Sequence, residues 1–372
     1  MRSNPLFYLD KILSYVSNEK NNAEQNITSL ETEYVSGMVY KNQFIEFCGE
    51  MAKLTGVRGF YSQDGIYCTK DRYLVGCYPK TSTDYEIEQI MFLKNYCDGL
   101  GVNLLYVNYP TKYMDDNLAM SEFGMDSYVN RNADLLIERM QDKGISVIDL
   151  RDNIVNESKD IKQMFYRTDH HWTVESGFWA SKIIAEGLNN YCGYNIDTSI
   201  YDDNNFSFER LEDCWLGEQG QKVSESYIGL DNFTVIKPIF ETSYLIPFEG
   251  ELLPRTFDRF VDDSNYDFTK DVHDIGSLHY SYYPIHSINT DVEFGKVLVL
   301  GDSFNNVVVP FLSLSIHEVD PIILRGMEDD FDLLNYIKEG NYDTVIVSYV
   351  ETEIGAHDAG SWNGKLFEFA KN

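Results

Sequence analysis

The sequence is poor in basic residues and in histidine. Its 372 residues include 30 Lys and Arg against 60 Asp and Glu, which gives a formal net charge of −30 at pH 7. Phosphate binding needs a concentrated basic surface, so this excess of acid argues against a nucleic-acid partner. Because the chain has only 7 histidines, two adjacent histidines beside an aspartate identify a candidate site.

Long apolar runs and an export signal are also absent. The longest near-apolar run, VVVPFLSLSI, is broken by Pro310 and is much shorter than the about 18 residues that cross a membrane. The first residues, MRSNPLFYLD, lack the basic and then apolar start of an export signal. The sequence therefore predicts no membrane span in this chain. Its location stays open between the cytoplasm and, if an export segment precedes this sequence, the cell envelope.

The cysteines have no metal-binding spacing. None of the 6 cysteines forms a CxxC pair, so zinc-ribbon spacing is absent. His273, His279 and His286 are too scattered in sequence to indicate a metal site. The residues predict neither a metal nor a cofactor.

Helical and strand-like segments alternate along much of the chain. Amphipathic helices are expected over 82–101, 127–145 and 173–191, and short apolar strands over 102–110 and 146–150. This alternation predicts an α/β fold with a parallel sheet covered by helices on both faces. The alternation stops between about 195 and 292, where strand-like aromatic segments indicate a β-rich insertion, and resumes with GKVLVLGDSF.

The motifs TDHHW and GDSF together predict a nucleophilic site. Ser303 follows a buried strand at a sharp turn, which is where open α/β sheets place their sites. A serine hydroxyl needs a base to take its proton, and that base is usually a histidine oriented by a carboxylate. Asp169 lies on a loop with two histidines, so it can orient His171, which can reach Ser303. By spacing alone His170 is a rival base.

These residues resemble the DHHW proteins, relatives of the alginate O-acetyltransferases that carry an SGNH-hydrolase-like domain. The resemblance lies in YRTDHHWTVESGFWASKIIAEGL and GDSF, with weaker likeness in CWLGEQGQ, VVVPFL and YDTVIVSYVET. It implies a flavodoxin-like sheet sandwiched by helices, with Asp169 as orienting acid, His171 as base and Ser303 as nucleophile. His170 is then expected to be structural and held by backbone or a buried polar group.

The resemblance implies further residues around the serine. SGNH hydrolases stabilise the oxyanion with a glycine N–H and an asparagine side chain, but here Thr352 stands near the expected asparagine with no glycine before it. Substitutes and substrate contacts are expected among five residues: Asn305, Asn306, Arg325, Lys112 and Tyr113. Trp172 is expected to be a packing residue, with a wall beside the histidine as the alternative. Packing in the core or at the surface is also expected of the aromatic residues of the insertion, with stacking on sugar rings as the alternative: Trp215, Tyr280, Tyr282 and Tyr283.

The domain organisation and activity follow from the same resemblance. Residues 1–44 are expected to form an N-terminal helical arm, and residues 45–372 the SGNH-like domain with its insertion. The implied activity is O-acetyl transfer to a cell-surface or extracellular polysaccharide, with a membrane protein as acetyl donor and an envelope location. Three alternatives remain: a carbohydrate acetyl esterase, a catalytically degenerate glycan-binding protein, and a metal-dependent phosphoesterase of the DHH type that holds manganese.

Overall fold

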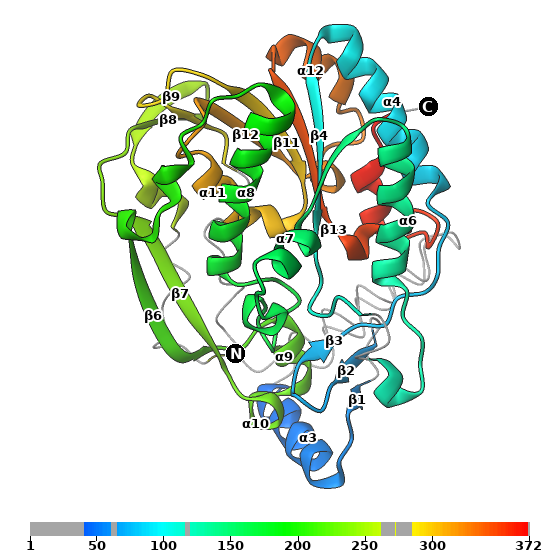
Figure 1. Cartoon of the computed structure of the whole chain (residues 1–372). Coiled ribbons are helices and arrows are strands. Elements are labelled where there is room, and N and C mark those ends of the chain that lie inside the picture. Colours follow the sequence, from blue (N-terminus) through cyan, green and yellow to red (C-terminus); the bar gives the residue numbers. More distant parts are fainter. Residues whose placement is uncertain (1–40, 61–64, 116–119, 262–271, 273–284, 371–372) are drawn as a thin grey trace, which may run out of the picture.

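The computed structural model describes residues 41–60, 65–115, 120–261, 272 and 285–370. An eight-stranded sheet forms its centre, with helices packed against it (Figure 1). In spatial order the strands are β5 (Ser146–Asp149), β4 (Asn103–Tyr109), β13 (Thr344–Val350), β11 (Lys296–Gly301), β12 (Glu318–Ile322), β10 (Ser287–Asn289), β8 (Tyr244–Phe248) and β9 (Glu251–Arg255).

The first five strands in this order pair in parallel, as the alternating sequence predicts. Gly301 of β11 lies opposite Ser348 of β13, which in turn lies opposite Val107 of β4. The carboxyl ends of these strands therefore meet along one edge of the sheet. The segments that follow β4, β11 and β13 meet there, in the place where open α/β sheets bind ligands.

The other three strands extend the sheet in antiparallel fashion. β10 pairs with β12 on one side and with β8 on the other, and β8 pairs with β9. All three strands come from the segment 195–292, as do β6 (Phe206–Trp215) and β7 (Asp231–Pro238), which form a separate two-stranded ribbon. This segment is rich in strands, as predicted, but part of it completes the main sheet.

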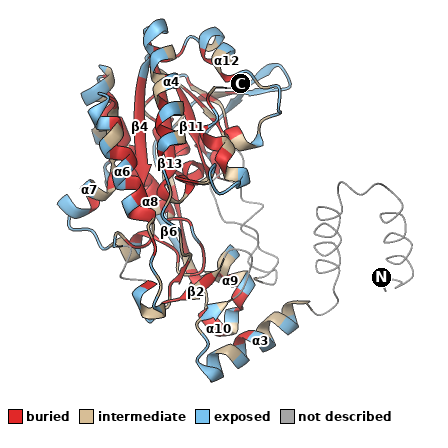
Figure 2. Ribbon diagram, turned by 90° about the vertical axis from the view of Figure 1, so that its right-hand side faces the viewer, coloured by how far each residue is buried: buried red, intermediate tan, exposed pale blue. Residues whose placement is uncertain are grey.

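Two groups of helices cover the two faces of the sheet. Alternate residues of β4 divide between the two cores: Leu104 and Tyr106 face one, and Leu105, Val107 and Tyr109 face the other. The first core packs α4 (Asp84–Leu100), α6 (Val129–Asp142) and α12 (Leu333–Gly340); the second packs α7 (Leu150–Asn156), α8 (Val174–Cys192) and α11 (Val309–Leu312). Figure 2 shows β4, β11 and β13 buried between them.

The helix that follows the TDHHW motif has well-defined ends. Thr173 is the N-cap of α8, and its side chain accepts a hydrogen bond from the Ser176 N–H. Gly193 ends the helix with a φ of 75°, a left-handed conformation that suits glycine. The DHHW residues therefore lie on the loop directly before a fixed helix start.

A smaller unit lies beyond the carboxyl edge of the sheet (Figure 1). It comprises α3 (Lys41–Thr55), β1 (Gly59–Phe60), β2 (Ile66–Cys68), β3 (Leu74–Val75), α9 (Glu218–Val223) and α10 (Glu225–Ile228). β1 pairs with β2 in antiparallel fashion. Of the N-terminal arm expected over 1–44, residues 1–40 lie outside the described residues, and the domain boundaries stay a prediction. Among the described helices, none has the length and apolarity required to cross a membrane.

Candidate active site

The serine turn is anchored to the neighbouring strand by a buried aspartate. β11 ends at Gly301, and a 3-10 helix, η8 (Ser303–Val307), begins immediately after Asp302. Asp302 Oδ1 accepts the Phe304 N–H at 2.9 Å, and Oδ2 accepts the Val350 N–H at 2.7 Å. Burial raises the pKa of Asp302 to about 6, although these two N–H groups oppose the shift. The Asp of GDSF therefore ties the turn to the end of β13.

Three predicted residues meet at this turn in a hydrogen-bonded chain. His171 Nε2 lies 2.7 Å from Ser303 Oγ, and His171 Nδ1 lies 2.6 Å from Asp169 Oδ1. Asp169 is fully buried, His171 is nearly so, and Ser303 is half-buried. The arrangement has the geometry of a nucleophile, a base and an acid that orients the base.

The Asp169 carboxylate is held ionised by donors around it. Oδ1 also accepts the His171 backbone N–H at 2.9 Å, and Oδ2 accepts the Glu218 N–H at 2.7 Å from the start of α9. Burial alone would raise the pKa of Asp169, but the charges of His171 and His170 and the hydrogen bonds from His171 lower it well below its ordinary value. An ionised Asp169 favours the tautomer of His171 that leaves Nε2 free to accept a proton.

The residues that hold the TDHHW loop in place were not predicted from the sequence. The Asp231 carboxylate accepts hydrogen bonds from the backbone of Arg167 and from both the N–H and the hydroxyl of Thr168. Thr168 in turn accepts the Gly217 N–H on its hydroxyl and the Gly220 N–H on its carbonyl. The one sequence signal for this support was the GEQG spacing within CWLGEQGQ, whereas Asp231 resembles any other aspartate of the chain.

His170 lies beside the other two residues of the motif. Its ring lies 3.8 Å from the His171 ring, and its Nδ1 lies 3.6 Å from Oδ1 of the buried Asp169, which is the kind of polar group expected to hold it. Its side chain is nevertheless 42% exposed and lines the pocket described below. Within the described residues, no hydrogen bond joins it to Ser303, and His171 is the better placed base.

Among the described residues, one group has the geometry of metal ligands, and it consists of Asp169, His170 and His171. The ligand atoms of Asp169, His170 and His171 lie within 4.8 Å of one another. However, both Asp169 oxygens already accept N–H groups, and His171 Nε2 is directed to Ser303 Oγ. This geometry suits proton transfer better than the two-ion site that the phosphoesterase alternative needs.

Lys112 and Tyr113, which follow β4, are near the site but are already hydrogen-bonded. Lys112 Nζ donates to the carbonyl oxygen of Leu74 at 2.6 Å and to Gln219 Oε1 at 3.3 Å, and burial lowers its pKa to about 8. The Tyr113 hydroxyl donates to Asp71 Oδ1 at 2.8 Å. Both residues line the pocket, and their predicted contact with substrate stays a prediction.

The two asparagines after the serine occupy different surroundings. Asn305 Oδ1 accepts from the hydroxyls of Tyr109 and Ser348, while its Nδ2 donates to the Ser348 carbonyl at 3.0 Å. These bonds join η8 to two strands and argue against an oxyanion role for Asn305. Asn306 is buried and lines a separate small cavity that also contacts Asp302; its role stays a prediction.

Arg325 follows the strand next to the serine strand and has few polar contacts. It follows β12 in a 3-10 helix (Leu324–Gly326), its guanidinium lies 5.3 Å from the centre of the Trp362 ring, and its Nη1 is 3.9 Å from Glu353 Oε1. Nη1 is buried and has no hydrogen-bond partner among the described residues. The predicted contact of Arg325 with an acyl oxygen or sugar hydroxyl stays a prediction.

Glu353 gives the stability of the protein a pH dependence. Burial, with the nearby charge of Asp302, raises the pKa of Glu353 to about 8 against the opposing effect of Arg325. The folded state therefore binds this proton more tightly than the unfolded state, and the stability it contributes is present below about pH 4.5 and is lost as the pH rises through about 8.

Glu353→Gln is expected to remove the loss of folding stability that accompanies the rise in pH. The melting temperature of the variant should rise relative to wild type between pH 5 and about pH 8.5, because each unit of pKa shift corresponds to about 1.4 kcal/mol. Glutamine retains the oxygen that accepts from Asn363 Nδ2. The exposed Glu209→Gln is the matched control. If the melting temperatures of all three proteins changed with pH in the same way, the raised pKa of Glu353 would be contradicted.

Two predicted packing residues are in the core. Trp172 is buried against Tyr109, with ring centres 4.7 Å apart, and its Nε1 donates to the Phe304 carbonyl at 3.1 Å. Trp215 is fully buried with its ring edge against Tyr166. Both packing predictions are confirmed. Tyr280, Tyr282, Tyr283, His273 and His279 are outside the described residues.

Comparison with known proteins supports the fold and the predicted resemblance. Residues 86–199 match the family model of the SGNH hydrolase-like domain of the acetyltransferase AlgX. The structure of PatB1 from Bacillus cereus superposes with a TM-score of 0.62 at 17% identity, covering 83% of this chain and 100% of that chain. A second PatB1 structure, which carries a sulfonyl adduct, gives a TM-score of 0.60 at 17% identity over 82% of this chain and 100% of that chain.

A DHHW family protein from Eubacterium siraeum DSM 15702 is also similar. It gives a TM-score of 0.58 at 16% identity, covering 85% of this chain and 99% of that chain. A search among curated proteins gave no sequence match. The fold is therefore that of an SGNH hydrolase-like domain, and the resemblance to the DHHW proteins and to the alginate acetyltransferases is confirmed.

Proposed function

We propose that the protein is a Ser-His-Asp acyltransferase that moves an acetyl or related acyl group onto a hydroxyl of a cell-surface or extracellular polysaccharide. The observation that carries the proposal is the chain of hydrogen bonds from Asp169 through His171 to Ser303 Oγ. The match of residues 86–199 to an acetyltransferase domain supports acyl transfer as the reaction.

The first half-reaction forms an acyl-serine. Ser303 Oγ attacks the carbonyl carbon of the donor ester while His171 Nε2 takes the hydroxyl proton. The tetrahedral oxyanion then collapses, the bond to the donor oxygen breaks, and His171 returns the proton to that oxygen. Asp169 keeps the ring oriented and stabilises its positive charge.

The second half-reaction consumes the acyl-serine. His171 takes a proton from a sugar hydroxyl, whose oxygen attacks the acyl carbon, and the bond to Ser303 Oγ breaks with return of the proton to the serine. The Ser303 N–H, at the first position of η8, is one of the N–H groups that a helix leaves unpaired and is available to the oxyanion. The membrane-protein acyl donor and the envelope location are part of this proposal and rest on the resemblance.

Covalent trapping tests the nucleophile. An aryl sulfonyl fluoride is expected to label wild-type protein once, with the added mass located by peptide mass spectrometry on Ser303. His171→Ala should label far more slowly, because Ser303 Oγ then loses the group that takes its proton. The exposed Ser207 serves as the internal reference. Labelling at Ser207 and other serines at the same rate as at Ser303 would refute an activated nucleophile.

A second measurement distinguishes transfer from hydrolysis. Wild-type protein is incubated with an activated acetyl ester with and without oligosaccharide acceptors, and the products are separated. Acetyl groups on the sugar, formed only with Ser303 present, are the expected result. Release of free acetate alone, unchanged by any acceptor, would replace the transferase proposal with an esterase of the same fold.

A further inference from the structure

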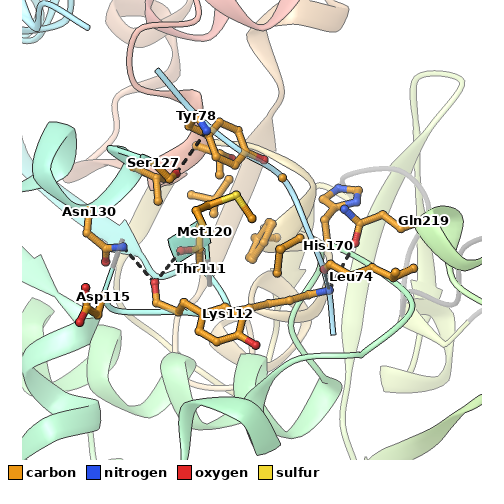
Figure 3. Close-up of a pocket in the computed structure, with 17 residues that line it drawn as sticks. Leu74, Tyr78, Thr111, Lys112, Asp115, Met120, Ser127, Asn130, His170 and Gln219 are labelled. Carbon is orange, nitrogen blue, oxygen red and sulfur yellow. Dashed lines mark hydrogen bonds between the residues drawn. The ribbon is translucent and has the colours of Figure 1, made fainter. Parts of the chain in front are cut away.

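A pocket lies next to the serine turn. Figure 3 shows its lining residues, with Lys112 at one wall and His170 at another. Apolar side chains from five different parts of the chain face it: Leu74, Val75, Met120, Val129, Phe304 and Val350.

Residues that neighbour the proposed catalytic residues line the pocket. Phe304 directly follows Ser303, and its ring centre is 5.2 Å from that of His171. Val350 donates its N–H to the Asp302 carboxylate, which precedes Ser303. His170, whose ring contacts the His171 ring, lines the pocket as well. A group attached to Ser303 Oγ therefore has this pocket beside it.

Most polar groups of the wall are already used within the protein. Lys112 Nζ donates to Leu74 O and Gln219 Oε1, and the Tyr113 hydroxyl donates to Asp71. Asn130 Nδ2 donates to the Tyr113 carbonyl at 2.9 Å, as the dashed lines of Figure 3 indicate for several of these bonds. Because Lys112 Nζ donates to three oxygen acceptors within the protein, it is poorly placed to bind an anion, and the surface left for a ligand is mainly apolar.

We infer that this pocket holds the alkyl chain of the acyl-serine, so that the enzyme takes linear acyl groups longer than acetyl, from butyryl to hexanoyl. This inference rests on the proposed function. An acetyl group would leave the apolar walls unfilled, whereas each further methylene that enters the pocket is removed from water. The chain does not react: the same acyl carbon bonds to Ser303 Oγ and then to the acceptor oxygen.

A series of p-nitrophenyl esters tests the inference on the full chain. For wild type, kcat/KM is expected to rise about fourfold for each methylene from acetate through butyrate to hexanoate, as complete burial of a methylene implies. The pocket-narrowing Val129→Phe is expected to lower the hexanoate-to-acetate ratio of kcat/KM at least about tenfold. Val155→Phe, the same substitution on the exposed face of α7, should leave the ratio unchanged.

A second variant covers the case in which Val129→Phe does not fold. Met120→Ala widens the pocket and is expected to shift the preferred ester from hexanoate to octanoate. The inference is overturned if acetate is the best ester of wild type and neither pocket variant changes the ratio. That result leaves the proposed function intact as long as acetate turnover still requires Ser303, whereas turnover that survives in Ser303→Ala would refute both.

Discussion

Ser303→Ala is expected to lower kcat/KM for an activated acetyl ester by roughly 10⁴- to 10⁶-fold. The acyl-enzyme cannot form without the hydroxyl, which lies 2.7 Å from His171 Nε2. Steady-state release of p-nitrophenol measures the loss. The melting temperature should change little, because the hydroxyl is half-buried at a turn and its removal leaves no cavity of consequence.

Three further variants separate chemistry from structure in this result. His171→Ala and Ser303→Ala are expected to lose similar activity, and the double variant is expected to lose no more than either, because the two residues act as a unit. The matched control is Ser207→Ala, a serine exposed on β6. Equal rates for wild type and Ser303→Ala, with both proteins folded, would rule out a serine nucleophile.

The sequence predicts the parallel half of the fold because its signals are local. Helices α4, α6 and α8 have an apolar face at helical spacing, and strands β4, β11 and β13 are buried apolar runs. The antiparallel continuation of the sheet by β8, β9 and β10 was not predicted. Pairing between strands far apart in sequence depends on which edge is free, and no local pattern reports that.

The reacting groups of the candidate site could be predicted from the sequence, but the residues that hold them in place could not. A serine after a strand and an acid two residues before a histidine are types with a recognisable chemistry. Asp302, Asp231 and Gly217 act by contacts across 48, 63 and 49 positions of sequence, respectively, to backbone or side chains of the site. Such contacts have no signature, because a hydrogen-bonding aspartate and a solvated one have the same letter.

His170 shows that a motif can identify a residue without predicting the direction of its side chain. The motif predicts correctly that one of two adjacent histidines faces the serine, but not how the other is used. In the structure its ring lies beside the Asp169 carboxylate and also faces the pocket. The direction of a side chain on an irregular loop depends on the packing around it, and periodicity provides no guide there.

Gly217, the first glycine of CWLGEQGQ, has a steric role, and its substitution is expected to lower activity strongly. A Cβ at Gly217 would lie 2.4 Å from the Asp169 Cβ, 2.8 Å from its Oδ2 and 2.8 Å from the Thr168 carbonyl oxygen. Real Cβ atoms do not approach other atoms so closely, so Asp169 or the start of α9 must move. The φ of Gly217 is −65°, which any residue adopts, and the requirement for glycine is therefore purely one of space.

Gly217→Ala is expected to lower kcat/KM for the acetyl ester by at least about 100-fold, because a displacement of about 1 Å in a reacting group has an effect of that size. The added methyl displaces the acid that orients His171 and weakens the Glu218 N–H bond to Asp169 Oδ2. Some loss of stability, about 1–3 kcal/mol, is expected from the overpacking. Gly326→Ala is the matched control, since a Cβ there meets no atom within 4 Å.

A double-mutant cycle decides whether the effect of Gly217→Ala on activity passes through Asp169. Asp169→Asn alone is expected to reduce kcat/KM by about 10⁴-fold. If the methyl group acts by displacing this carboxylate, adding Gly217→Ala to Asp169→Asn should cost far less than its 100-fold effect in wild type, because residues in contact do not behave additively. Full additivity of the two losses, with both proteins folded at the assay temperature, would show that Gly217 matters for stability or binding and not for the position of the acid.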